Sequence, residues 1–193
     1  MKITLASTSK FKNNILNTVG IHHDCVDPTC KENSSFQNPY EYVKDLALKK
    51  AESIKTHNTD IIIGLDTIVL INDKTIEKPK SIEEAKENLR NSSNNTTKVI
   101  TGISLINNQT KEVVSDYQET LVTFNEIAEQ DIEYYIANEK DAMYASGFII
   151  ETICSNFISK IEGSYYNILG VPVEKIYQIL NSWNIHLQDI TKN

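Results

Sequence analysis

The sequence predicts a mixed α/β fold, in which helices flank a central β-sheet. In the first half of the chain, segments with strand and helix patterns alternate, whereas several strand-like segments follow one another later on. The chain has 193 residues, of which 40% are hydrophobic. A chain of this size can bury a full core, either as one domain or as two lobes that share a sheet.

The chain opens with a short strand that leads into a helix. Residues 3–6 are apolar, residues 7–9 form a turn rich in hydroxyl groups, and a helical pattern begins at Lys10, with apolar residues at i, i+4 and i+8. Such a turn directs unpaired backbone N–H groups to one place, where an anion can bind. Lys10 and Lys12 add positive charge there. The alternative interpretation is an N-capped helix with surface lysines.

The other elements follow in order along the chain. Residues 40–54 predict an amphipathic helix, and residues 60–73 predict a strand buried on both faces because they are rich in β-branched side chains. The further expected elements are an extended segment at 21–30, a hairpin turn at 72–75, a helix at 81–90, strands at 98–106, 117–124, 148–150 and 156–161, and helices at 128–137 and 173–180. We expect a single domain over residues 1–187 and a frayed tail over residues 188–193.

Composition excludes several classes of protein. The net charge is −7, which argues against binding to a nucleic acid polymer. No apolar run approaches the roughly 20 residues of a membrane span, and the N-terminus lacks the apolar core of a signal peptide, so we expect a cytoplasmic protein without a membrane partner. The three cysteines have neither disulfide nor zinc spacing.

Asp66 is the most informative single residue. It interrupts the apolar strand at 60–73, and a carboxylate buried there must be paired, bound to a metal, or placed at the strand end as a structural aspartate. Glu32, Lys50 and Lys78 are each, taken alone, typical of a protein surface. Together with Asp66 they provide two acids that can hold Mg²⁺ and two lysines that can neutralise a polyphosphate.

Other phosphate and nucleophile signatures are absent. The sequence has no G-x-x-x-x-G-K-[ST], no G-x-G-x-x-G after a strand, and no G-x-S-x-G. Ser7 and Ser9 have no histidine in a recognisable partner motif, which argues against a serine hydrolase.

Several short motifs, in order, resemble the Maf family of nucleoside-triphosphate pyrophosphatases. They are LASTS with a basic helix, the acid at Glu32, LALKKA, IIGLDTIV, EKP, VITGISL and EGSYYNILGVP, and they extend from about Lys2 to Leu180. The resemblance implies a fold like that of inosine triphosphate pyrophosphatases, with an elongated mixed sheet and two lobes around a cleft. It also implies hydrolysis of a nucleotide to its monophosphate and pyrophosphate.

The resemblance also implies roles for individual residues. The acids Glu32 and Asp66 would coordinate Mg²⁺ or Mn²⁺, and Asp66 would also orient or deprotonate the attacking water. The residues implied for the substrate are Ser7, Ser9 and Lys12 around the triphosphate, Lys50 and Lys78 on the phosphates, Thr101 and Gly102 at the floor of the cleft, and Glu151 near the base.

Base choice is predicted from Glu151 and from two further positions. A carboxylate offers only acceptors, which suit the edge of guanine. Phe11 after LASTS resembles the branch that acts on 7-methyl-GTP, whereas Asp66-Thr67 resembles the branch that acts on dTTP and UTP. We predict a modified or non-standard nucleotide, 7-methyl-GTP in the first place and dTTP or UTP otherwise.

The sequence departs from the family pattern at three places. Lys12 stands where the family has arginine, which keeps the charge but loses the bidentate fork. Residues 93–95 read Ser-Asn-Asn in place of Ser-Gly-Arg, and Ser146 and Thr152 replace glycines. These changes bear on turnover and base preference more than on the type of reaction.

Two rival interpretations remain open. The first is a regulator of septum formation that binds nucleotide without cleaving it, and the second is a structural α/β domain whose charges are all solvated. The retained acids and lysines argue against the first, and Asp66 argues against the second. The aromatic pair Tyr165-Tyr166 and the resemblance together predict a homodimer.

Overall fold

The computed structural model describes residues 1–144 and 146–191. The chain forms two compact units. The first comprises Met1–Thr67, Ile100–Glu119 and the chain from Ser164 onward, and the second comprises Ile68–Val99 and Thr120–Gly163. No helix in the described residues is long and apolar enough to cross a membrane.

The central sheet has seven strands and is mixed, as the sequence predicts. The strands are β1 (Ile3–Ala6), β2 (Asp24–Val26), β3 (Ile61–Ile71), β4 (Lys74–Ile76), β5 (Thr96–Asn107), β6 (Val113–Phe124) and β7 (Ile158–Gly163). Their order is β2-β1-β3-β5-β6-β7, and β4 pairs with β3. Strand β1 is parallel to β2 and β3, whereas β4 and β7 are antiparallel to their partners.

The helices begin at side-chain caps where the sequence provides them. The α-helices are α1 (Lys10–Thr18), α2 (Pro39–Ser53), α3 (Ile82–Ser92), α4 (Glu129–Asn138), α5 (Tyr165–Ile168), α6 (Val173–Ser182) and α7 (Leu187–Ile190), and two 3₁₀ helices cover Lys140–Tyr144 and Ile153–Phe157. The side chains of Ser9, Asn38 and Ser81 accept hydrogen bonds from backbone N–H groups in the first turns of α1, α2 and α3.

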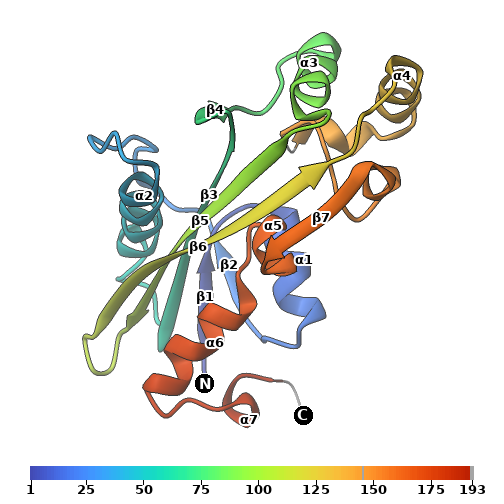
Figure 1. Ribbon diagram of the computed structural model, residues 1–193. Helices are drawn as coiled ribbons and strands as arrows, with labels where there is room; N and C mark the ends of the chain where they lie inside the picture. The colour runs from blue at the N-terminus through green and yellow to red at the C-terminus, as the bar shows by residue number, and fades with distance from the viewer. Residues whose placement is uncertain (145, 192–193) are drawn as a thin grey trace. The chain divides into compact units, whose positions relative to one another are not determined.

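In the first unit, helices cover both faces of the sheet. Ile61, Ile63 and Leu65 of β3 belong to an apolar cluster with residues of α1, α6 and α7, whereas Ile62 packs with Ala51 of α2. Figure 1 shows α2 on one side of β1 and β3, with α1 and α6 on the other side. Alternating side chains of one strand therefore supply two cores, which explains why β3 is apolar throughout.

Two glycines let α2 lie close against the sheet. A Cβ atom on Gly64 of β3 would lie 2.1 Å from the Ala47 carbonyl oxygen, and one on Gly102 of β5 would lie 2.1 Å from the Val43 carbonyl oxygen. No side chain fits at these positions, because real Cβ atoms do not come so close to backbone oxygens. The close approach holds Lys50, near the C-terminal end of α2, against β3.

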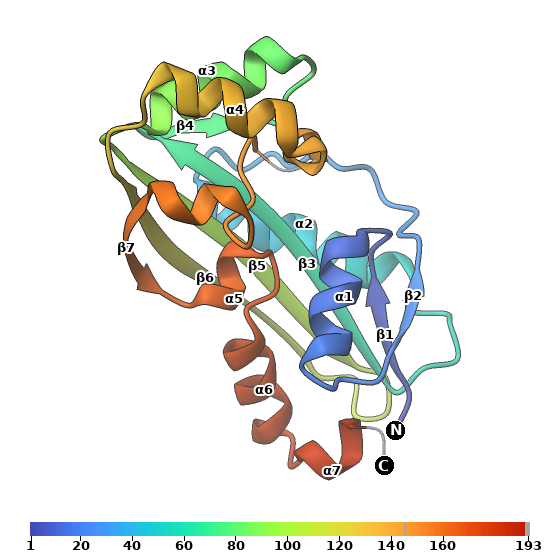
Figure 2. The ribbon, with the colours of Figure 1, turned by 90° about the vertical axis from the view of Figure 1, so that its right-hand side faces the viewer.

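The second unit packs helices α3 and α4 side by side, as both views show (Figures 1 and 2). Its aromatic core includes Phe124 and Phe148, whose rings meet edge to face at 5.3 Å. The buried Tyr135 hydroxyl accepts a hydrogen bond from the Ile149 N–H group. This bond ties the segment after the 3₁₀ helix at 140–144 to α4.

The structure departs from the sequence expectations in several places. Phe11, one of the three apolar residues at helical spacing in the expected first helix, is 38% exposed. Residues 148–150 form no strand, strand β7 starts two residues later than expected, and α5 was not anticipated. Residues 187–190, of which 188–190 were expected to be frayed, form α7, and the apolar side chain of Ile190 is buried in the core. Residues 192–193 of the expected tail lie outside the described residues.

Candidate active site

The serine turn after β1 is organised by its own hydroxyl groups. The Ser7 hydroxyl accepts a hydrogen bond of 3.1 Å from the Ser9 N–H group. The Ser9 hydroxyl caps α1 by accepting from the Lys12 N–H group at 3.4 Å. Both predicted phosphate ligands therefore lie where strand β1 meets the N-terminus of α1, and both shape the turn itself.

Lys12 reaches from α1 to the strand that carries Asp66. Its Nζ donates a hydrogen bond of 3.0 Å to the carbonyl oxygen of Leu65, directly before Asp66. Gly170, with φ +78°, lies against the same lysine: a Cβ there would be 3.2 Å from Lys12 Cε and 3.0 Å from Thr67 Oγ1. Helix α1, strand β3 and the turn before α6 therefore meet around this ammonium.

Lys50 joins the two predicted acids. Its Nζ lies 2.7 Å from Asp66 Oδ1 and 2.8 Å from Glu32 Oε1. The side chains of Lys50 and Asp66 are each 12% exposed, whereas that of Glu32 is 66% exposed. Burial disfavours the charged ammonium, but the carboxylates of Asp66 and Glu32 outweigh this effect and raise the pKa of Lys50 above its usual value. Lys50 is therefore a cation at neutral pH.

Thr101 and Gly102 lie on β5 next to these groups, with different surroundings. Thr101 is fully buried, and its hydroxyl lies 3.1 Å from the Thr67 hydroxyl and 3.4 Å from the carbonyl oxygen of Asn167 in α5. Gly102 faces the backbone of α2, as described above. Thr101 thus connects β3, β5 and α5, and Gly102 sets the distance between the sheet and α2.

Lys78 and Glu151 belong to the second unit. Lys78 is exposed in the loop after β4, where it lines a hollow of about 220 Å³ together with residues of α3. Glu151 is exposed just before the 3₁₀ helix at 153–157. The segment that leads to it is tied to α3, because the Asn88 amide donates to the Ser146 carbonyl oxygen at 3.0 Å.

The donor set fits a divalent cation that binds together with a substrate. Among the described residues, no group of three or more His, Cys, Asp and Glu side chains is arranged to hold a metal ion alone. Glu32 and Asp66, however, contact the same ammonium, so their carboxylates lie close together. One or two carboxylates completed by phosphate and water oxygens are the usual Mg²⁺ environment at phosphate sites.

Sequence reasoning did not single out Thr67 or Gly170 as parts of this region. Thr67 was noted only as a marker of one family branch, although its hydroxyl links β3 to Thr101. Gly170 was one letter of the motif EGSYYNILGVP, and its positive φ is a signal that only the backbone reveals. Both lie in the first unit with Lys12, Lys50 and Asp66.

Comparison with known proteins gives a consistent result. The family model described as Maf-like protein matches residues 2–183. A dTTP/UTP pyrophosphatase of Clostridium perfringens (strain SM101 / Type A) is 37% identical over 189 residues, covering 96% of this chain and 98% of the relative. One of Thermoanaerobacter sp. (strain X514) is 35% identical over 182 residues, covering 93% and 95%. One of Bacillus cereus (strain ATCC 10987 / NRS 248) is 34% identical over 186 residues, covering 95% and 91%. The chain belongs to the Maf family.

Proposed function

We propose that this protein hydrolyses a nucleoside triphosphate to the monophosphate and pyrophosphate, and that dTTP and UTP are its substrates. The proposal rests mainly on Lys50, a largely buried ammonium that contacts both Asp66 and Glu32. Lys12 adds a second cation at the carbonyl group directly before Asp66. The names of the similar proteins, dTTP/UTP pyrophosphatase, support the same reaction.

In this proposal, the lysines stabilise the charge that develops on the phosphate oxygens. Lys12 and Lys50 act as fixed cations, and the raised pKa of Lys50 excludes it as a general base at neutral pH. Lys78, from the loop after β4, is proposed as a further phosphate ligand. Electrostatic stabilisation of this kind is usually the largest contribution to phosphoryl-transfer catalysis.

Asp66 is the proposed acceptor of the proton from the attacking water. Its Oδ1 accepts from Lys50, which leaves Oδ2 to receive that proton. The water oxygen bonds to the α-phosphorus, the bond from that phosphorus to the bridging oxygen breaks, and pyrophosphate leaves. Glu32 and Asp66 would also hold Mg²⁺ or Mn²⁺, which when bound supplies positive charge to the phosphate oxygens.

The choice of dTTP and UTP replaces the preference for 7-methyl-GTP drawn from the sequence. That preference rested on Glu151 and on Phe11, and Phe11 is partly exposed on α1. Thr67, which marked the dTTP/UTP branch, has its hydroxyl 3.1 Å from the Thr101 hydroxyl, and the similar proteins are named dTTP/UTP pyrophosphatase. We therefore rank dTTP and UTP above 7-methyl-GTP.

The test is pyrophosphate release from dTTP, UTP, 7-methyl-GTP and GTP by the purified protein, with Mg²⁺ and with a chelator. We expect Mg²⁺-dependent turnover that is fastest with dTTP or UTP. Asp66→Asn should lower kcat by about 10²–10⁴-fold, whereas Arg90→Lys, in a surface ion-pair network, is the matched control and should retain it. Faster cleavage of 7-methyl-GTP would reverse the substrate choice. Tight nucleotide binding without turnover would favour the non-catalytic regulator instead.

A further inference from the structure

Glu32, one of the two proposed metal ligands, lies in the loop between β2 and α2. Residues 27–38 of this loop, all of which the structure describes, form neither helix nor strand. The Glu32 side chain is 66% exposed, yet its Oε1 lies 2.8 Å from Nζ of Lys50, whose side chain is 12% exposed. An exposed side chain loses conformational entropy when it is held at one place. The contact with Lys50 therefore depends on how the loop backbone is held.

Three side chains in one row of α2 contact this loop. Asp45, Lys49 and Ser53 are spaced by four residues, so they lie along the same side of the helix. Lys49 Nζ donates a hydrogen bond of 2.8 Å to the carbonyl oxygen of Asn33, the residue directly after Glu32. Lys49 thus binds the backbone next to the acid.

The other two members of the row contact the loop before and after the acid. The Ser53 hydroxyl accepts a hydrogen bond of 3.2 Å from the Thr29 N–H group. The Asp45 carboxylate accepts a hydrogen bond from the Ser34 side chain. These contacts follow the loop and the helix in opposite directions, so the loop lies antiparallel along α2, with the acid between two points of attachment.

Asp45 also fixes the ammonium of Lys49. Its Oδ2 lies 2.7 Å from Lys49 Nζ, and the two side chains are 19% and 39% exposed. Burial raises the pKa of Asp45, but hydrogen bonds from Lys49 and Ser34 and the charge of Lys49 outweigh it and keep that pKa below its usual value. Asp45 is therefore ionised at neutral pH, and Lys49 is held between this carboxylate and the Asn33 carbonyl oxygen.

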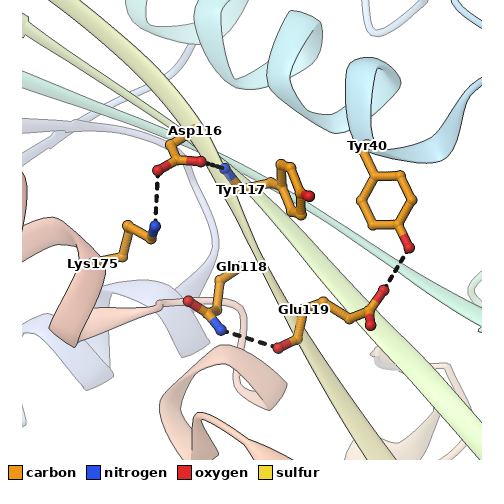
Figure 3. Close-up of a pocket in the computed structure, with 6 residues that line it drawn as sticks. All are labelled: Tyr40, Asp116, Tyr117, Gln118, Glu119 and Lys175. Atoms are coloured by element: carbon orange, nitrogen blue, oxygen red, sulfur yellow. Dashed lines mark hydrogen bonds and ion pairs between the residues drawn. The ribbon is translucent and has the colours of Figure 1, made fainter.

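Helix α2, which carries the row, is itself fixed to the sheet. Gly64 and Gly102 let its backbone lie against β3 and β5, as described above. In its first turn, the Tyr40 hydroxyl donates to Glu119 Oε2 at 2.6 Å, and the Tyr40 ring lies 4.8 Å from that of Tyr117 (Figure 3). All of these residues belong to the first unit. The row therefore holds the loop against a helix whose own position is set by the strands.

We propose that Lys49 is a positioning residue that holds Glu32 against Lys50. Asp45 and Ser53 support it in this role. The proposal rests on the proposed function, in which Glu32 is a ligand of the divalent cation. Lys49 acts through the loop backbone and not on the substrate. A carboxylate that is fixed in advance binds a cation more tightly than one on a mobile loop, because the entropy of ordering is already lost before binding.

The first test measures opening of the loop independently of catalysis. Trypsin cleaves after lysine, and Lys31 is exposed directly before Glu32. Lys49→Met keeps the length of the side chain but removes the donor, so cleavage after Lys31 should become faster by about tenfold. Lys49→Arg, which keeps a donor and the charge, should be cleaved like the wild type. An unchanged rate in Lys49→Met would overturn the proposal.

The matched control is Lys55→Met. The Lys55 side chain is 40% exposed and its Nζ lies 2.6 Å from Glu52, which resembles the 39% and 2.7 Å of Lys49 with Asp45. This variant should leave cleavage after Lys31 at the wild-type rate. Equal acceleration in Lys55→Met and Lys49→Met would show that the loss of either lysine has the same effect, and would overturn the assignment to Lys49.

The second test is the Mg²⁺ dependence of pyrophosphate release. Lys49→Met should raise the Mg²⁺ concentration at half-maximal rate by about threefold to tenfold, with kcat at saturating Mg²⁺ close to that of the wild type. In a Glu32→Gln background, the same substitution should add no further change, because the acid that it positions is gone. An equal loss in both backgrounds would indicate a structural role alone and would overturn the proposal.

Failure of the proposal is distinguishable from failure of the proposed function. If the wild type hydrolyses no nucleotide, the proposed function is wrong, and the rate of cleavage after Lys31 still decides whether Lys49 holds the loop.

Discussion

Each of the two units contains a network in which one cation contacts several carboxylates. In the first unit, Lys50 contacts Asp66 and Glu32, and the side chains of Lys50 and Asp66 are each 12% exposed. In the second unit, Arg90 contacts Glu83, Glu87 and Glu129, and these acids are 53% to 69% exposed. The N···O distances of the two networks are similar, because all of these contacts lie within hydrogen-bond distance or close to it.

The difference between the networks is the access of their ion pairs to water. Water screens exposed ion pairs, so they contribute little to stability. When a buried charge loses its partner, no water takes the place of that partner. Removal of one member of a buried ion pair is therefore strongly destabilising. We therefore expect the Lys50 network to be sensitive to substitution and the Arg90 network to be tolerant.

The largest effect is expected for Lys50→Met. Removal of the ammonium leaves the buried Asp66 carboxylate without its partner, which should lower the free energy of unfolding by about 3–5 kcal/mol. If the proposed function is correct, kcat/KM should also fall by about 10²–10³-fold. Urea unfolding and pyrophosphate release measure the two effects.

A double variant separates the two consequences of Lys50→Met. Lys50→Met with Asp66→Asn removes the unpaired charge, so it should regain much of the lost stability without regaining activity. A double variant that is as unstable as Lys50→Met alone would show that packing, and not charge, explains the loss.

The next effect concerns one glycine in each unit. Gly64→Ala places a Cβ 2.1 Å from the Ala47 carbonyl oxygen and should lower the free energy of unfolding by about 3 kcal/mol. In the second unit, Gly147→Ala places a Cβ 3.2 Å from the Ala85 carbonyl oxygen at φ +102°, and should lower it by about 1–2 kcal/mol. Thermal unfolding of both variants gives the ranking, and an equal or reversed ranking would contradict the close packing of α2.

A smaller effect is expected at alkaline pH in the second unit. Burial raises the pKa of the Cys154 thiol from 9.0 to about 12. The unfolded chain therefore releases this proton first, and the stability due to the neutral thiol is complete below pH 9 and is lost as the pH rises toward 12. The expected slope for one proton is about 1.4 kcal/mol per pH unit.

Cys154→Ala isolates this contribution. Urea unfolding between pH 8 and pH 11 (about three pH units) should show a flatter decline for the variant than for the wild type, because one titrating group is missing. Burial also raises the pKa of Tyr135, and Cys154 adds a smaller increase, so Tyr135 lowers stability at alkaline pH in the same direction in both proteins and slightly less in the variant. Parallel declines would show that the thiol does not titrate differently in the folded state.

The smallest effect is expected for Arg90→Ala. The guanidinium loses contacts to three exposed carboxylates, which water replaces, so the free energy of unfolding should remain close to that of the wild type. Turnover should also be retained. A loss of stability as large as that of Lys50→Met would contradict the expectation that the Arg90 network tolerates substitution and the Lys50 network does not.

Much of the fold is predictable from the sequence because local patterns report burial directly. The inward positions of α2, including Val43, Leu46 and Ala47, are buried as the helical spacing predicts. The apolar run of β3 indicates a strand covered on both faces. Residues 187–190 were misjudged because a short polar segment offers no periodic signal, although Ile190 packs into the core.

The candidate site was predictable only in part. Asp66 stands out because a carboxylate in an apolar strand needs a partner, and Lys50 provides it. Thr67 and Gly170 contact groups that are distant in sequence, so no local pattern marks them.

The sequence by itself therefore determined the class of fold, the family, and the acids and lysines of the predicted site. Only the tertiary structure decided that one ammonium contacts both Glu32 and Asp66, and that Gly64 and Gly102 bring α2 against the sheet. The physical reason is the distance along the chain over which each interaction acts. Hydrophobic periodicity acts between neighbours in the chain, whereas the strength of a charge pair depends on water access and contacts that arise only when distant segments pack together.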